Sequence, residues 1–201
     1  MKVRSIKLKK YSSISKNIAN SRLYLGKNKL TFHPQNLRYL KGFRKNFVVL
    51  DVNKIELSLK KVLKLIYNLN KKNKRILFIG LPELKDKLFS TKNSHDFISH
   101  NFWVPGILSN KLNVLNNFKL HNYKDLKVMN VTKIPDLIVI LDNNFDRSFL
   151  SEIYKLNIPV VSLINYSQNF ENIDFKLFGN MMYKESSNFI YSLLKIVLKN
   201  K

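Results

Sequence analysis

The stretch PDLIVILDNNFDRSFLSEIYKLNIPVVSLIN, residues 135–165, decides the fold. Residues 135–142 and 158–165 contain apolar runs without polar alternation, and residues 147–157 between them have the composition of a helix. Unalternated apolar runs of this length are typical of strands buried on both faces of a parallel sheet. The stretch therefore predicts a strand, a helix and a second strand parallel to the first.

The alternation of strands and helices continues on both sides of this unit. Residues 53–74 carry Ile, Leu and Val at helical spacing with lysines on the opposite face, which predicts an amphipathic helix. The other expected elements are strands at residues 46–52, 75–80 and 96–102, a helix that begins near Pro82, and a final helix at residues 185–200 capped by Ser186 or Ser187. This order predicts an α/β fold, a three-layer α/β/α arrangement with a mostly parallel, flavodoxin-like sheet.

The composition indicates a folded protein with a polyanionic partner. The chain has 201 residues, which suits one domain, and 45% of them are hydrophobic. It has 36 Lys and Arg residues against 13 Asp and Glu residues, a formal net charge of +23. Nucleic acid is the first expected partner, and an anionic membrane surface is the alternative. No apolar run approaches the roughly 20 residues of a membrane-spanning helix, so no membrane span is expected.

The positive charge is concentrated in the N-terminal part of the chain. Up to Arg75 the only acidic residues are Asp51 and Glu56. Residues 1–21 are interpreted as a basic arm, which either orders on RNA or serves as an import presequence. Residues 22–201 are interpreted as a single α/β domain. The polyanion is therefore expected to bind the N-terminal third.

The sequence contains no pattern that predicts an active site. It has no cysteine, no Walker-type loop and no G-x-S-x-G motif, and no second glycine follows Gly80 closely. The four histidines do not have metal-ligand spacing. Asp142 is interpreted either as an acid or ligand or as the cap of the next helix. The chain is expected not to be an enzyme and to have no cofactor, metal or small-molecule substrate, with a flavodoxin-like nucleotide- or flavin-binding protein as the alternative.

Four segments in a fixed order resemble the signature blocks of the ribosomal protein S2 family of the small ribosomal subunit. They are residues 25–51, 101–110, 135–165 and 173–180. The residues that match the family motifs are Gly26, Pro34, Tyr39, Gly42, Asp51, Trp103, Gly106, Asn110, Asp142, Pro159, Gly179 and Asn180. The family's long helical hairpin is trimmed in this chain to residues 111–133. The resemblance implies the α/β/α fold that the periodicity predicts.

The resemblance also implies a function. A member of this family is a non-catalytic, structural constituent of the small ribosomal subunit, which binds its rRNA near the neck between head and body. Neighbouring small-subunit proteins are the other expected partners. The candidate rRNA-binding residues are the cations of the first block: Arg22, Lys27, Lys29, Arg38, Lys41, Arg44 and Lys45.

Several residues have two interpretations. Tyr24, Phe32, Tyr39 and Phe43 are interleaved with these cations, and each either stacks on an unpaired base or packs in the core. The segment around Trp103 either packs at an edge of the sheet or presents Asn110 to RNA or a neighbouring protein. Gly179 and Asn180 form either a tight turn or an interface contact.

The location is inferred from coding bias. The chain has a single alanine, Ala19, while Lys, Asn and Ile, whose codons are AT-rich, are abundant. An AT-rich genome together with a divergent, bacterial-type family member predicts a mitochondrial ribosome. A plastid or bacterial origin is the alternative.

Overall fold

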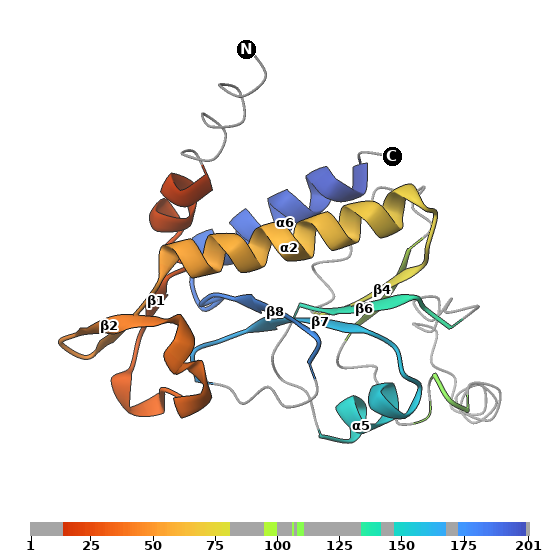
Figure 1. Ribbon diagram of the computed structural model, residues 1–201, viewed down its shortest axis with the longest axis horizontal. Coiled ribbons are helices and arrows are strands. Elements are labelled where there is room, and N and C mark those ends of the chain that lie inside the picture. Colours follow the sequence, from red (N-terminus) through yellow and green to blue (C-terminus); the bar gives the residue numbers. More distant parts are fainter. Residues whose placement is uncertain are drawn as a thin grey trace, which may run out of the picture.

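The computed structural model describes residues 14–80, 95–99, 106, 108–110, 134–141, 147–167 and 173–199. Its centre is a parallel sheet in the order β5-β4-β6-β7-β8 (Figure 1). The strands are β4 (Ile76–Gly80), β5 (Asp96–Ser99), β6 (Leu137–Ile140), β7 (Val160–Ile164) and β8 (Phe175–Phe178). In chain order the strands are arranged 2-1-3-4-5, which is the flavodoxin-like order.

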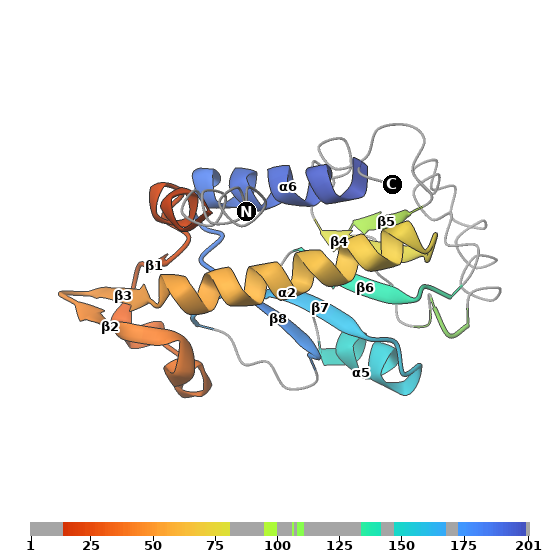
Figure 2. The same cartoon turned by 45° about the horizontal axis from the view of Figure 1, so that its top comes forward.

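Helices cover both faces of this sheet. The helices α2 (Val52–Lys71) and α6 (Lys184–Lys199) lie side by side on one face, and α5 (Arg147–Lys155) lies on the other (Figures 1 and 2). The predicted three-layer α/β/α fold with a parallel sheet is thus confirmed. Across the described ranges, the helices lack the combination of length and apolarity that crossing a bilayer requires.

Each central strand contributes to two hydrophobic cores. In β4, Ile76 and Phe78 belong to the cluster beneath α2 and α6, whereas Leu77 and Ile79 belong to the cluster beneath α5. All four side chains are fully buried. Two apolar layers need apolar residues at every position of a strand, which explains why these strands have no polar alternation.

A second, smaller sheet lies at one end of the molecule. Its strands are β1 (Leu25–Gly26), β2 (Leu40–Arg44) and β3 (Phe47–Leu50), paired antiparallel in the order β1-β3-β2. The short helices η1 (Lys29–Thr31) and η2 (Pro34–Tyr39) connect β1 to β2. The predicted strand 46–52 is therefore β3, but it belongs to this small antiparallel sheet. We call the segment from Arg22 to Leu50 the hairpin end.

The predicted elements differ from the observed ones mainly at their boundaries. The helices predicted at 53–74, 147–157 and 185–200 correspond to α2, α5 and α6, and the strands predicted at 75–80, 96–102, 135–142 and 158–165 correspond to β4, β5, β6 and β7. The strand β8 was not predicted. The helix expected near Pro82 lies outside the described residues.

The expected serine cap of α6 is wrong. The helix begins at Lys184, so Ser186 and Ser187 lie within its first turn. The buried Ser186 Oγ donates a 2.6 Å hydrogen bond to the carbonyl of Ser21, and Ser187 Oγ donates to the carbonyl of Lys184 at 2.9 Å. Residues 14–20, at the end of the predicted arm, are helical, and Ile18 is fully buried in the main core. The start of α6 is thereby attached to the first described segment of the chain.

Replacing Asp136 by asparagine is expected to destabilise the chain at neutral pH but not in acid. Asp136 Oδ1 accepts a 3.0 Å hydrogen bond from Lys74 Nζ, and Oδ2 accepts one of 2.9 Å from the backbone N–H of Arg75. These bonds hold the pKa of Asp136 below its ordinary 3.8. Because the folded pKa is the lower one, the stabilisation is complete above the unfolded pKa and is lost as the pH falls through the folded pKa.

Urea unfolding measures this effect. Since the Asp136–Lys74 pair is exposed, the Asp136→Asn variant should be less stable by only about 0.5 kcal/mol at pH 7, and the difference should vanish near pH 2. Lys74→Gln, which removes the same ion pair, should show the same pH dependence. A difference of equal size at both pH values would contradict this account.

Candidate nucleic-acid interface

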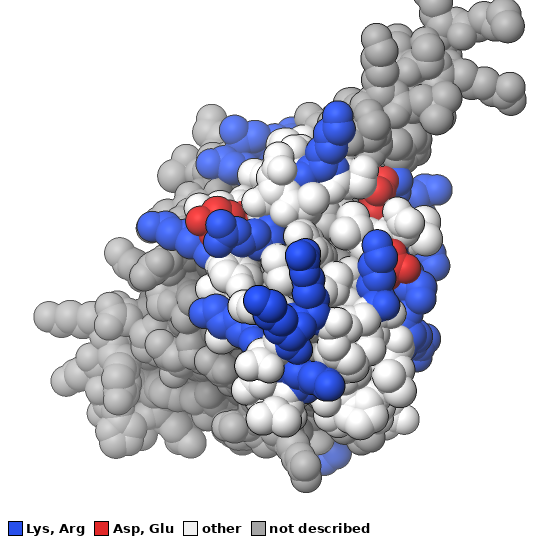
Figure 3. Space-filling model, turned by 90° about the vertical axis from the view of Figure 1, so that its left-hand side faces the viewer, with Lys and Arg blue, Asp and Glu red and all other residues white. Residues whose placement is uncertain are grey.

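The hairpin end brings together the seven cations that the sequence predicts to bind RNA. Arg22 precedes β1, Lys27 follows it, and Lys45 lies in the turn between β2 and β3 with a φ of 53°. The side chains of all seven are exposed. The remaining four lie in η1, η2 and β2: Lys29, Arg38, Lys41 and Arg44. Figure 3 shows this end of the molecule, where Lys and Arg spread over the face with few Asp or Glu among them.

The positive charge of the hairpin end is not neutralised within the described part of the chain. The ion pairs there join Lys54 to Asp51, Lys60 to Glu56, and Lys74 to Asp136. None of the seven predicted cations takes part in them. Because uncompensated charge on one face attracts polyanions, this surface is suited to a phosphate backbone.

Aromatic rings lie directly beside several of these cations. Lys29 Nζ is 4.9 Å from the centroid of Phe43, and Arg38 Cζ is 5.7 Å from that of Tyr39. Arg22 Cζ and Lys27 Nζ lie 5.9 Å and 5.5 Å from the centroid of Tyr183. Tyr183 comes from just before α6, and sequence reasoning did not connect it with the cations. Cation–π contacts restrain the side chains while leaving their charge available.

The four interleaved aromatics differ in their surroundings. Tyr39 stacks on Phe178 with ring centroids 3.4 Å apart, and Phe32 and Tyr24 are partly buried against the main core. Phe43, by contrast, is 43% exposed. Core packing thus describes the first three, and Phe43 is the ring of this set that is open to a base.

One buried tyrosine fixes the hairpin end to the large sheet. Tyr166, just after β7, is 3% exposed, and its hydroxyl accepts hydrogen bonds from the N–H groups of Lys27 at 3.2 Å and Asn28 at 3.3 Å. Its carbonyl accepts bonds from His33 N at 3.0 Å and Asn36 Nδ2 at 2.9 Å. Sequence reasoning missed Tyr166, because its partners lie in a distant segment. Its bonds determine where the cationic loops stand relative to the core.

Comparison with known proteins agrees with this geometry. A family model described as ribosomal protein S2 matches residues 18–131 and 122–200.

The chain belongs to the ribosomal protein S2 family.

Among similar proteins are several named small ribosomal subunit protein uS2. That of Carsonella ruddii is 30% identical over 217 residues, which cover 92% of this chain and 97% of that protein. Those of Rickettsia conorii and Rickettsia akari are 24% and 23% identical over 199 residues, covering 82% of this chain and 67% of each. The resemblance to the S2 family that the sequence motifs indicated is confirmed.

Gly179 and Asn180, in the last segment that resembles the S2 motifs, attach the hairpin end to the end of β8. Asn180 is fully buried, accepts a 3.0 Å bond from Met182 N through Oδ1, and donates through Nδ2 to the carbonyl of Leu25. At Gly179 a Cβ atom would lie 2.5 Å from Leu23 Cδ1, so only glycine lets the two segments approach this closely. Gly179 and Asn180 therefore join β1 to the end of β8 inside the protein.

Five further residues at positions that resemble the S2 motifs, four in the N-terminal block and Pro159, have local structural roles. Pro34 begins η2, Gly26 lies against the ring of Tyr166, and Gly42 lies at an irregularity in the pairing of β2 with β3. Asp51 is the N-cap of α2, where its Oδ1 accepts a 3.0 Å bond from Asn53 N. The exposed Pro159 precedes β7, and its carbonyl accepts a bond from Ile138.

The tryptophan-containing S2 motif is described only in part. Trp103 and Asp142 lie outside the described residues. Gly106 has a φ of 90°, a conformation that favours glycine, and its N–H donates to Glu152 Oε2 at 2.9 Å. Glu152 Oε1 accepts from Leu108 N at 3.1 Å and from the N–H and hydroxyl of Ser109, both at 3.0 Å. The exposed Asn110 closes this turn through its N–H, which donates to the carbonyl of Gly106 at 2.7 Å.

The Glu152→Gln variant is expected to destabilise the S2 chain by about 1–3 kcal/mol. The Glu152 carboxylate is 8% exposed and accepts four bonds, whereas a glutamine amide offers one oxygen and two hydrogens to the same donors. Urea unfolding gives the free energy, and faster amide exchange at Leu108 and Ser109 locates the effect. The exposed Glu185, changed to Gln as a control, should shift stability by less than about 0.5 kcal/mol. Unchanged exchange at both amides would contradict the assigned role.

The described residues were also compared with the ligand groups that a metal site requires. In those ranges no three or more His, Asp or Glu side chains are grouped so that they could hold a metal ion. His33 accepts a 3.4 Å bond from Gln35 N and caps η2, while His95 Nε2 lies 3.1 Å from Asn70 Oδ1. His100 and His121 lie outside the described residues. Each described histidine thus has a structural contact.

Proposed function

We propose that this chain is a structural constituent of the small ribosomal subunit and binds small-subunit rRNA near the neck between head and body. The observation that carries the proposal is the hairpin end, with its seven exposed cations that no described carboxylate neutralises. Membership of the S2 family supports the same function. Neighbouring small-subunit proteins are its other proposed partners, with no membrane and no small-molecule substrate.

Binding in this proposal needs no chemical step. The lysines and arginines of the hairpin end neutralise phosphates and release condensed counterions, so the logarithm of the binding constant falls with the logarithm of salt by about 0.7–0.9 per phosphate. Arginines such as Arg38 and Arg44 also offer two parallel donors to one phosphate. Tyr166 and Asn180 keep this surface in one orientation on the core. The chain is therefore proposed to be non-catalytic.

The ribosome is proposed to be mitochondrial. The AT-rich coding bias, visible in the single alanine and the many Lys, Asn and Ile residues, supports this location. The similar proteins named above come from bacteria, so a bacterial ribosome is the competing location. Immunofluorescence with a mitochondrial marker in cells that express the protein distinguishes the two.

Sedimentation of a lysate tests the main proposal. A tagged full chain is expected to migrate with the small subunit in a sucrose gradient and to leave that fraction after RNase treatment. Migration of the intact chain as a free protein at low salt, with the RNA undegraded, would refute the proposed function.

A further inference from the structure

A groove of about 490 Å³ runs along α2 beside the start of β8. Figures 1 and 2 both show α2 next to this strand. Four cations line the groove: Arg38 from η2, Lys54 and Lys61 from α2, and Lys176 from β8. Only Arg38 is among the seven cations of the hairpin end. The groove is therefore a second cationic surface, formed by segments that are far apart in the sequence.

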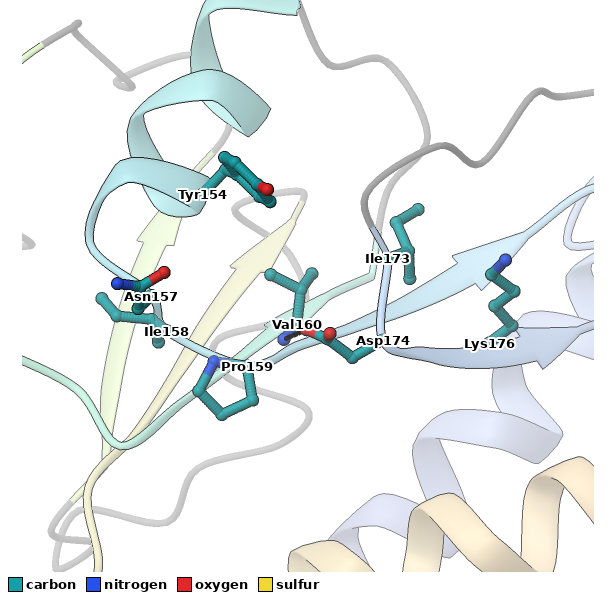
Figure 4. A pocket seen from close by; sticks show the side chains of 8 residues that line it. All are labelled: Tyr154, Asn157, Ile158, Pro159, Val160, Ile173, Asp174 and Lys176. Carbon is teal, nitrogen blue, oxygen red and sulfur yellow. Dashed lines mark hydrogen bonds between the residues drawn. The ribbon is translucent and has the colours of Figure 1, made fainter.

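One carboxylate, that of Asp174, lines this groove together with the four cations, so the charge of the groove remains positive. Asp174 Oδ2 accepts a 2.9 Å hydrogen bond from the N–H of Val160, which holds the starts of β7 and β8 together. Figure 4 shows the Asp174 side chain directed to Val160 and the Lys176 side chain pointing away from it. Burial lowers the pKa of Lys176, and the nearby charge of Arg38 lowers it further. Lys176 and Arg38 therefore repel each other, and an anion bound in the groove would reduce that repulsion.

Apolar side chains stand open among these cations. Phe175 is 37% exposed and Leu57 is 57% exposed, and both line the groove. An aromatic ring among cations that follow a channel is the arrangement by which proteins hold single-stranded nucleic acid, since a base stacks on the ring and phosphates meet the cations. The bases of a duplex are already stacked and do not reach such a ring. The chemistry of the groove thus favours an unpaired RNA segment over an acidic protein segment.

We propose that the groove between α2 and β8 binds a short single-stranded segment of RNA, with phosphates at Lys61 and Lys176 and one base against Phe175. The proposal rests on the proposed function, because it adds a second contact to the same RNA partner. It makes the chain bind RNA along two surfaces that meet at Arg38.

Fluorescence anisotropy with a labelled 12-nucleotide oligouridylate tests the groove in the full chain. The Lys61→Glu/Lys176→Glu variant should bind at least about tenfold more weakly, and its salt slope should fall by about 1.4, which is two phosphates of single-stranded RNA. Phe175→Ala should weaken binding about fivefold or more without changing the slope. A duplex probe of the same length should not distinguish Phe175→Ala from wild type.

A matched control distinguishes the effect of the groove residues on RNA binding from the effect of a changed net charge. Lys71→Glu/Lys199→Glu makes the same charge change at two exposed sites, at the ends of α2 and α6 away from the hairpin end (Figure 1). It should weaken oligouridylate binding less than about threefold, the loss expected from screened long-range charge. Since Lys176 is partly buried, Lys61→Glu alone serves as a second variant, with about half the effect on a logarithmic scale.

Several outcomes would overturn the inference. These are a wild-type chain that does not bind the oligouridylate, an equal loss in the control, and unchanged binding in the Phe175→Ala variant. Unchanged RNA binding together with lost incorporation into the subunit would assign the groove to a protein neighbour instead. The wild type and the groove variants could all sediment with the small subunit and bind the oligouridylate equally well. In that case the groove proposal fails and the proposed function stands.

Discussion

Reversing the charge of Lys29 and Arg44 together is expected to abolish incorporation of the chain into the small subunit. Both side chains are exposed at the hairpin end, where the backbone N–H of Lys29 donates a 2.9 Å bond to the carbonyl of Asn46 in the hairpin turn. Two cations that we propose to neutralise phosphates become two anions that repel them. The affinity for small-subunit rRNA should fall at least about 100-fold at 0.15 M salt. The slope of the logarithm of the binding constant against the logarithm of salt should be lower in magnitude by about 1.6. Gradient sedimentation and filter binding measure the two effects.

The fold should survive this double substitution. Neither side chain is buried, and the interaction that is lost is the cation–π contact of Lys29 with Phe43. The free energy of unfolding in urea should change by less than about 1 kcal/mol. The Lys71→Glu/Lys199→Glu variant, which has the same charge change at the other end, should still incorporate. If both double variants incorporate equally well, the hairpin end is not the RNA contact.

Replacing Tyr166 by alanine is expected to cost about 3–5 kcal/mol of stability, more than the loss expected for Glu152→Gln. The ring is buried against Gly26 and belongs to the main core. Alanine leaves a cavity there and removes the acceptor for the N–H groups of Lys27 and Asn28. The midpoint of urea unfolding measures this loss. The dependence of the free energy of unfolding on urea concentration should be the same as in wild type.

Tyr166→Phe is the matched control, because it keeps the ring and removes only the hydroxyl. It should cost about 1 kcal/mol and should accelerate amide exchange at Lys27 and Asn28. If Tyr166→Ala still folds at low temperature, its rRNA affinity should also fall, although no charge has changed. Wild-type exchange at both amides in the Phe variant would show that Tyr166 does not hold the cationic loop.

Four of the five strands of the large sheet, β4 to β7, were predictable from runs of apolar residues in the sequence. Residues 76–79 are apolar at every position, and the structure directs them alternately into two cores. The α2 helix was predictable for a similar reason, since Ile55, Leu59, Val62 and Ile66 repeat at helical spacing and face one of these cores. Where burial follows a regular period, the sequence determines the element.

The strands β1, β2 and β8 were not predictable in this way. β1 has two residues, β2 contains two cations and a glycine, and β8 begins with an exposed phenylalanine. Such strands depend on distant partners, as when Asn180 donates to Leu25 of β1. The small antiparallel sheet therefore had to be found in the structure.

The candidate interface was predictable only as far as its residues are close in sequence. The seven cations lie within residues 22–45, so their clustering follows from the chain itself. The groove was missed because its lining residues on α2 and β8 come together only when these two elements pack in the folded chain. Glu152 lies in the predicted helix 147–157, but its bonds to the turn at 106–109 were not visible in the sequence.

The hairpin end and the preceding Ser21 are attached to parts of the chain that are synthesised late. Ser186 binds the carbonyl of Ser21, Asn180 binds that of Leu25, and Tyr166 holds the amides of Lys27 and Asn28. Because translation proceeds from the N-terminus, the cationic segment leaves the exit tunnel well before any of these three partners. A polypeptide terminated before β7 has the cations of the hairpin end but lacks Tyr166 and Asn180, so it cannot make the bonds that attach this segment to the large sheet. Only a chain synthesised as far as the start of α6 can form all three of these attachments.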